Sequence, residues 1–163
     1  MTKLNGPHTI VLVTCREHME IAGKTQLKED VSTVGWHMPC SHKPKMYAIA
    51  IFKNHFTAEV IKKSESFAVN FIPHEMEKEA LFCGKHTGYH MDKFVEGKIE
   101  TEEAYSIDAP IIKNALAVIE CELEHQYESG DHIIFVGRIV SEEIKKEGKR
   151  LLHIDEDVFS TTQ

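Results

Sequence analysis

The feature that most constrains this chain is a series of short apolar runs, rich in β-branched residues, that Gly, Pro, Asn and Asp separate. Runs of this length and composition are typical of buried strands. The sequence predicts main strands at residues 9–15, 31–38, 46–52, 67–72, 115–124 and 132–140, with a short last strand at 151–154. About six strands with short helices between them favour a closed or nearly closed antiparallel barrel.

The segments between these runs predict turns. Residues 17–30 are polar and indicate a hairpin-like excursion, whereas residues 39–45 contain two prolines and predict a turn. The Ser-Gly-Asp sequence at residues 129–131 is expected to join the two strands beside it into a hairpin.

Two short helices are also expected. Thr57 is predicted to cap the N-terminus of the first helix, whose Val60 and Ile61 face inward. Helical spacing recurs over residues 74–82, and the glycine-containing residues 83–88 are expected to end that helix.

The composition is that of one globular domain. The chain has 163 residues, of which 42% are hydrophobic and 28% charged, so a single domain over residues 1–163 is expected. The four cysteines are widely spaced and form no C-x-x-C pair, which disfavours a zinc ribbon and favours reduced thiols. No apolar run reaches ~18 residues, and the N-terminal segment lacks the apolar core of a signal peptide. We therefore expect a cytoplasmic protein that does not span a membrane.

Charge and motif content disfavour several functional classes. The 19 Lys and Arg residues against 26 Asp and Glu residues leave a formal net charge of −7 without a basic face, so no nucleic-acid partner is expected. The patterns G-x-S-x-G, H-E-x-x-H, the P-loop and G-x-G-x-x-G are absent, which disfavours a doubly wound dinucleotide fold. The 11 histidines are scattered, and only His86 and His90 approach a ligand spacing, so no metal ligands are assigned.

A candidate ligand site surrounds Trp36, the only tryptophan, which precedes the predicted turn with Cys40 and Ser41. An aromatic wall next to backbone N–H donors suits a flat, partly polar ring such as the isoalloxazine of a flavin. Each residue also has a plainer interpretation. Trp36 could fill one end of the barrel, and Cys40 could be a small buried hydrophobe.

Three further segments carry polar groups that could meet such a ligand. The corner before Thr57 offers a hydroxyl and free backbone N–H groups at a helix start, which is typical of a phosphate site. Lys93 could stabilise a reduced anionic flavin ring, and His132 follows a Gly-Asp turn. The plainer alternatives are an ordinary N-cap for Thr57, a surface lysine for Lys93 and a satisfied strand edge for His132.

The order of these segments resembles a known family. The chain is similar to the flavin reductase-like family, and within it to the flavoredoxin type, in the blocks D-V-S-T-V-G-W-H-M-P-C-S-H-K-P, H-F-T-A-E-V-I-K-K-S-E-S-F-A-V-N, D-K-F and E-C-E-L…G-D-H-I-I-F-V-G-R-I-V. The similarity covers about residues 7–155. It implies a mainly β fold, namely a six-stranded antiparallel split β-barrel (the FMN-binding split barrel) with short flanking helices.

The resemblance also implies a function. Members of this family bind FMN non-covalently, are usually homodimers, and move electrons between a nicotinamide nucleotide or protein donor and an acceptor. We therefore expect an FMN-dependent oxidoreductase with NAD(P)H as a candidate donor and a nicotinamide nucleotide or redox protein as partner. No catalytic residue is assigned, because hydride delivery to flavin N5 needs positioning rather than an acid–base side chain.

The resemblance further implies which residues bind the cofactor. Trp36 would lie beside the ring, Thr57 near the phosphate, and Phe159 over the ring, while Lys93 and His132 would face the flavin. The full implied set is Asp30, Ser32, Thr33, Val34, Trp36, Cys40, Ser41, Asn54, Thr57, Asn70, Lys93, His132 and Phe159.

Two positions depart from the family pattern. Asp30 stands where the family has Asn, and an acid near FMN is unfavourable unless it is neutral or points away. His55 stands where the family often has Arg, which makes phosphate binding more sensitive to pH.

Three hypotheses of different kinds remain open from the sequence. The first is an FMN flavoprotein of the flavoredoxin type that transfers electrons. The second is an NAD(P)H:flavin oxidoreductase that uses flavin as a released substrate. The third is a non-enzymatic, histidine-rich barrel that binds a metal or haem.

Overall fold

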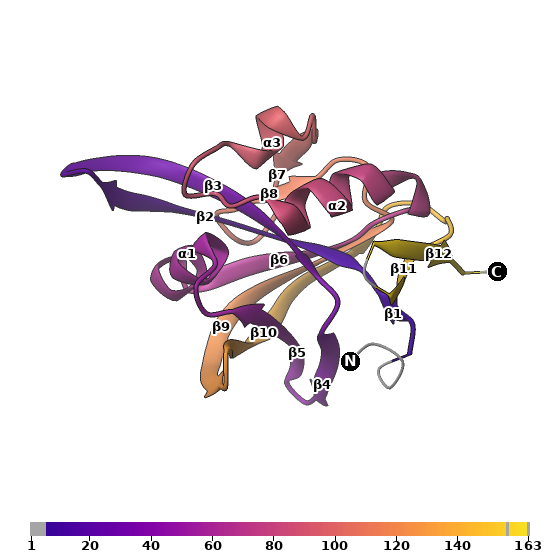
Figure 1. The fold of residues 1–163 in the computed structure, drawn as a ribbon. Helices are drawn as coiled ribbons and strands as arrows, with labels where there is room; N and C mark the ends of the chain where they lie inside the picture. The colour runs from indigo at the N-terminus through magenta and orange to yellow at the C-terminus, as the bar shows by residue number, and fades with distance from the viewer. Residues whose placement is uncertain (1–5, 156, 163) are drawn as a thin grey trace.

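The computed structural model describes residues 6–155 and 157–162, and its main feature is a twisted antiparallel sheet (Figure 1). The seven strands are ordered β3-β2-β6-β9-β10-β5-β4. No ladder joins the edge strands β3 and β4 within the described residues, so hydrogen bonds do not close the barrel. The predicted mainly β, antiparallel fold is confirmed, with seven strands in the main sheet in place of six. These strands are β2 Val11–Ile21, β3 Lys24–Val34, β4 His37–His42, β5 Lys45–Phe52, β6 Ser66–Phe71, β9 Ala117–Ser129 and β10 His132–Ile144.

Smaller elements cover this sheet (Figure 1). The helices are α1 Phe56–Ser64, α2 Glu77–Lys85 and α3 Lys93–Glu96, with a 3-10 turn, η2 His74–Met76, before α2. None of these described helices is long and apolar enough to cross a membrane. A three-stranded sheet, in the order β1-β11-β12, and a β7–β8 pair complete the fold. Their strands are β1 His8–Thr9, β7 Thr101–Glu103, β8 Pro110–Ile112, β11 Leu151–Asp155 and β12 Val158–Thr161.

The first five residues of β2 are buried on both faces of the sheet, to which successive side chains of a strand point in turn. Val11 and Val13 of β2 belong to one core cluster together with Phe135 of β10 and the inner face of α1. Leu12 of the same strand belongs to a second cluster together with Phe94 of α3 and residues of α2. Burial on both sides explains why the first part of β2 has an almost continuous apolar sequence.

The hairpin of β2 and β3 projects from the body of the molecule (Figure 1). Its ladder ends where Ile21 lies opposite Lys24. The two turn residues, Ala22 and Gly23, have φ values of 50° and 75°, which suit a tight turn between twisted strands. The hairpin-like excursion predicted over residues 17–30 is confirmed, and it belongs to a longer pair of strands.

The turn predicted at residues 39–45 is wrong for most of its length. β4 continues through His42, and Pro39 pairs with Tyr47 of β5. A proline is tolerated here because β4 is an edge strand and a bulge follows the proline. The turn itself contains only Lys43 and Pro44.

The predicted starts of two helices differ from the structure. α1 begins at Phe56 with His55 as its N-cap, so Thr57 lies inside the helix, fully buried, and is not the predicted cap. α2 ends at Lys85, within the predicted stop at residues 83–88, but it begins at Glu77, because residues 74–76 form the 3-10 turn η2. In α1, packing of the helix against the sheet therefore outweighs the local capping signal of Thr57.

Gly137 of β10 tests how closely the core is packed. An added Cβ atom would lie 2.6 Å from Cβ of Cys121 and 2.8 Å from Cζ of Phe67. We expect Gly137→Ala to lower the free energy of unfolding by about 1–3 kcal/mol, the usual cost of overpacking, as measured by urea unfolding. Gly84→Ala is the control, because its Cβ would meet Thr33 at an ordinary 3.6 Å. Equal losses in the two variants would contradict close packing at Gly137.

Candidate functional site

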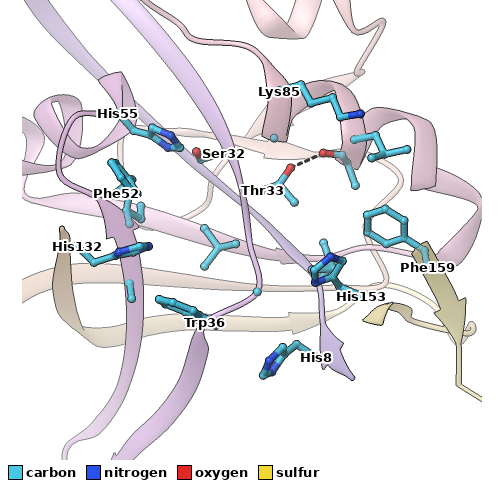
Figure 2. A pocket seen from close by; sticks show the side chains of 18 of the residues that line it. His8, Ser32, Thr33, Trp36, Phe52, His55, Lys85, His132, His153 and Phe159 are labelled. Atoms are coloured by element: carbon cyan, nitrogen blue, oxygen red, sulfur yellow. Dashed lines mark hydrogen bonds between the residues drawn. The ribbon is translucent and has the colours of Figure 1, made fainter. Parts of the chain in front are cut away.

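A cavity of about 420 Å³ lies where strands of the main sheet meet α2 and the β11–β12 hairpin (Figure 2). Small-molecule sites typically have volumes of about 300–1,000 Å³. The lining comes mainly from the end of β3, the end of β5, the start of β10, α2 and the small three-stranded sheet. Its residues are His8, Ile10, Ser32, Thr33, Val34, Gly35, Trp36, Ala50, Ile51, Phe52, His55, Ala80, Leu81, Gly84, Lys85, His132, His153, Asp157 and Phe159.

An aromatic wall closes one side of this cavity (Figure 2). Trp36 follows the end of β3, and its ring centroid lies 4.8 Å from that of His132, the first residue of β10. Phe52 lies opposite His132 in the ladder, with 5.1 Å between the two ring centroids. The Ala50 N–H donates to the Trp36 carbonyl at 2.9 Å, which holds this segment against β5. Trp36 is 44% exposed, so part of its surface is open to a ligand.

The edge of β3 and one face of α2 form a second wall. Because β3 ends the sheet, its outer backbone N–H and C=O groups have no strand partner among the residues described. Residues 32–34 of this strand line the cavity. The Thr33 hydroxyl donates to the Ala80 carbonyl of α2 at 2.6 Å, and Gly84 packs next to the same threonine. A flat ring with polar edges can pair with such a strand edge.

His37, which follows Trp36 in the chain, is held in place by two hydrogen bonds. Its Nε2 lies 2.7 Å from the Thr9 carbonyl, which can only accept, so Nε2 donates and Nδ1 accepts from the Tyr47 hydroxyl at 2.8 Å. Burial lowers the pKa of His37, which keeps the ring neutral, and raises the pKa of Tyr47 to about 12. This neutral pair holds the backbone next to Trp36.

A buried ion pair supports β3 just before its cavity-lining residues. Asp30 and Lys93 are 1% and 3% exposed, and Nζ of Lys93 lies 3.0 Å from Oδ1 of Asp30. Thr57 donates its hydroxyl to Oδ2 of the same carboxylate at 2.6 Å. The network ties α1 and α3 to β3. Asp30, the acid that departs from the family pattern, is therefore paired inside the protein and is not part of the cavity lining.

The cavity brings together a subset of the residues predicted from the sequence. Asp30, Thr57 and Lys93 are not among its lining residues, because they form the buried network. Phe159 reaches the cavity from β12, which places it beside His153 with 5.3 Å between their ring centroids. The predicted residues that line the cavity are Ser32, Thr33, Val34, Trp36, His132 and Phe159.

The other predicted residues lie elsewhere. Asn70 is fully buried, where its amide donates to the Leu12 carbonyl and accepts from the Ile112 N–H, so it joins strands within the core. β4 and the turn after β5 contain the remaining residues, all outside the lining: Cys40, Ser41 and Asn54.

Sequence reasoning missed the lining residues of α2 and those of β1 and β11 in the small sheet. His8 of β1 pairs in register with His153 of β11, and both line the cavity. They come from opposite ends of the chain, so no local pattern links them. A signal did exist for α2, because Ala80 and Gly84 are small residues four positions apart and share one helix face.

The permanent positive charge of the lining comes from α2. Lys85 is the only Lys or Arg among the lining residues, and its Nζ lies 2.7 Å from Oδ2 of Asp157. His55 also lines the cavity, but partial burial and, to a lesser extent, the charge of Lys93 lower its pKa below the ordinary value. Its ring is therefore mainly neutral near pH 7.

The buried ion pair predicts a non-additive effect on stability. Lys93→Met leaves a buried carboxylate without its counter-ion, so we expect the free energy of unfolding to fall by about 3–5 kcal/mol. Adding Asp30→Asn should restore much of this loss. Urea unfolding of both single variants and the double variant would measure the coupling, and purely additive losses would contradict a direct pair. Lys113→Met is the control, because it breaks an exposed pair with Glu100 and should change stability little.

Comparison with known proteins agrees with this architecture. The family model described as the flavin reductase like domain matches residues 4–162. The crystal structure of flavoredoxin from Methanosarcina acetivorans has a TM-score of 0.81 and 25% sequence identity, and the match covers 96% of this chain and 86% of that one.

Two curated relatives align over shorter stretches. A protein of Archaeoglobus fulgidus is 30% identical over 113 residues, which are 69% of this chain and 64% of that protein. An NADH-dependent FMN reductase of Streptomyces nodosus subsp. asukaensis is 26% identical over 107 residues, which are 66% of this chain and 57% of that protein. The chain thus spans less than two thirds of either relative. The family model covers almost its whole length, and the chain belongs to the flavin reductase-like family, as its ordered sequence blocks predict.

Proposed function

We propose that this chain binds FMN non-covalently in the cavity and moves electrons between a reduced nicotinamide nucleotide or a redox protein and an acceptor. Its membership of the flavin reductase-like family supports this proposal, as does the name of the Streptomyces relative, an NADH-dependent FMN reductase. The observation that carries the proposal is the cavity, which combines an aromatic wall, a free strand edge and a lysine.

The lining fits a flavin in shape and polarity. Trp36, Phe52 and His132 offer ring surface against which an isoalloxazine can pack. The free edge of β3 at residues 32–34 offers backbone N–H and C=O groups for the polar rim of the same ring. Small-molecule sites commonly combine such apolar walls with a few fixed polar groups.

His132 is held in one orientation within this wall. Its Nδ1 lies 2.6 Å from Oδ1 of Asp131, and this hydrogen bond lowers the pKa of the carboxyl group. Because Nδ1 donates to Asp131, Nε2 remains available to a bound ligand. The rings of Trp36 and Phe52 contact the imidazole as well.

The bound cofactor would supply the redox chemistry, and the protein would supply its position. Hydride transfer needs no proton from a lining side chain, so these side chains bind, orient and exclude water. Asp30, Lys93 and Thr57 would act indirectly, by holding β3 through their buried network. Lys93 would then support the strand and would not place an uncompensated charge beside the ring.

A second candidate is an NAD(P)H:flavin oxidoreductase that uses flavin as a released substrate. The exposure of the aromatic wall, 44% for Trp36 and 38% for Phe52, favours a site that can exchange its ligand. NAD(P)H oxidation that depends on added free flavin would select this reaction over a tightly bound cofactor. The third hypothesis has no comparable support for a metal ion, because no group of three or more metal-ligating side chains gathers in the part of the chain described.

We also propose that the chain works as a homodimer in the cytoplasm. Met38 of β4 is 59% exposed, and Ile134 and Val136 of β10 are partly exposed. Val136 lies opposite Ala48 in the sheet, and Ala48 lies opposite Met38, so these side chains form one apolar patch. A second copy of the chain would remove this patch from water. The four cysteines are free, which suits a reducing compartment.

Flavin binding tests the proposed function directly. We expect FMN to bind, with a change in flavin fluorescence, and Trp36→Ala to weaken binding about tenfold, because a stacked aromatic pair contributes about 0.5–1.5 kcal/mol beyond its buried area. Tyr105→Ala is the control, since this residue is 92% exposed and outside the lining. Unchanged affinity in Trp36→Ala would place the ring elsewhere, and a wild-type protein that binds no flavin would exclude the function.

The apolar patch predicts the effect of a buried charge on association. Met38→Glu should raise the dimer dissociation constant about tenfold or more, because an unpaired charge would enter a desolvated interface. Sedimentation equilibrium would measure this constant. Val95→Glu is the control, because Val95 is 69% exposed but lies on α3, away from the patch. A wild-type protein that stays monomeric at micromolar concentration would contradict the proposal.

A further inference from the structure

The cavity has two chemically different ends. Figure 2 shows Trp36, Phe52 and His132 together at one end, and Lys85 with Phe159 at the other. The aromatic end suits a flat ring, whereas the other end carries the only Lys or Arg of the lining. A ligand that joins a ring to an anionic group would match this arrangement.

Two other basic side chains near the cavity, His55 and Lys93, offer no free positive charge. His55 is mainly neutral near pH 7, because partial burial lowers its pKa. Lys93 is paired with Asp30 in the buried network and does not line the cavity. The whole chain carries a formal net charge of −7, so an anionic ligand meets a repulsive background. Lys85 is therefore the group best placed to compensate a negative charge.

The present partner of Lys85 is easily replaced. Nζ of Lys85 lies 2.7 Å from Oδ2 of Asp157, and the two side chains are 56% and 64% exposed. Exposed ion pairs of this kind contribute little to stability. The β11–β12 hairpin is held independently by its ladders to β1 and between its own strands, and by the buried Leu151. The fold therefore does not require this ion pair.

We propose that Lys85 binds a phosphate group of a nucleotide held in the cavity, and that Lys85 pairs with Asp157 when no nucleotide is bound. The inference rests on the proposed function and adds a phosphate-binding residue to it. A phosphate oxygen accepts a charge-assisted hydrogen bond from Nζ and replaces the Asp157 carboxylate as its partner. The phosphate has two sources in this reaction, namely FMN itself and the nicotinamide donor.

This exchange predicts opposite effects for the two ends of one ion pair. Lys85→Met should weaken the phosphate-bearing ligand about tenfold, because a charge-assisted hydrogen bond is lost. Asp157→Asn should strengthen the same ligand, because the competing carboxylate is removed while Lys85 is kept. If the ion pair only fastened the hairpin, Lys85→Met and Asp157→Asn would change the ligand affinity in the same direction.

The experiment compares flavins with and without the FMN phosphate, and nicotinamide donors with and without the 2′-phosphate. Fluorescence titration gives the dissociation constants of FMN and riboflavin, and anaerobic flavin bleaching gives the concentration dependence for NADH and NADPH. Lys113→Met is the matched control, because its pair with Glu100 is 3.0 Å long and the two side chains are 57% and 66% exposed. Neither Lys113 nor Glu100 lines the cavity.

Each outcome has a definite meaning. If Lys85→Met weakens FMN but not riboflavin, and Asp157→Asn tightens FMN, the phosphate is that of the flavin. If flavin affinities are unchanged but the donor's half-saturating concentration rises in Lys85→Met and falls in Asp157→Asn, the phosphate is that of the donor. The inference would be overturned if Lys85→Met and Asp157→Asn changed ligand affinity in the same direction. It would also be overturned if both variants bound the ligands as Lys113→Met does. A wild-type protein that binds neither flavin nor donor would instead overturn the proposed function.

Discussion

The antiparallel ladder between β5 and β10 is the interaction on which the site depends. Its register places His132 at the start of one strand opposite Phe52 at the end of the other. The Ala50 N–H then holds Trp36 against the same ladder. A slip of one residue would turn Phe52 to the opposite face of the sheet, so the wall exists only in this register. The geometry of the wall is therefore set by the same hydrogen bonds that build the fold.

Two polar arrangements hold the end of β3 from different sides. Asp30 and Lys93 pair inside the protein before the strand reaches the cavity, and His37 is fixed by Tyr47 just after it. Polar groups in a low-dielectric interior stabilise one arrangement when their partners are present and are costly when partners are missing. Such pairs hold a strand edge in one position, which is what orientation of a flat ligand requires.

The opposite end of the cavity has a different physical character. There the contact between Lys85 and Asp157 is exposed to water and contributes little to folding. An aromatic end and a solvent-exposed charged end together match a ligand with a ring and an anionic group. In the exchange proposed for this end, the protein would set the position of the ring, and Lys85 would exchange the Asp157 carboxylate for the anionic group of the ligand.

Local sequence patterns predicted most of the antiparallel strands and the turn at residues 129–131, because strand alternation and turn chemistry are properties of neighbouring residues. The ordered family blocks gave Trp36 and His132 as candidate site residues, and both line the cavity. They did not determine the roles of Thr57 and Lys93. A hydroxyl at a helix start and a lysine beside an aspartate give the same sequence pattern whether the side chains face a ligand or the core. Here both side chains contact Asp30. Only the tertiary structure decided this, and only it brought His8 beside His153, because those partners are distant in sequence and meet through the pairing of whole strands.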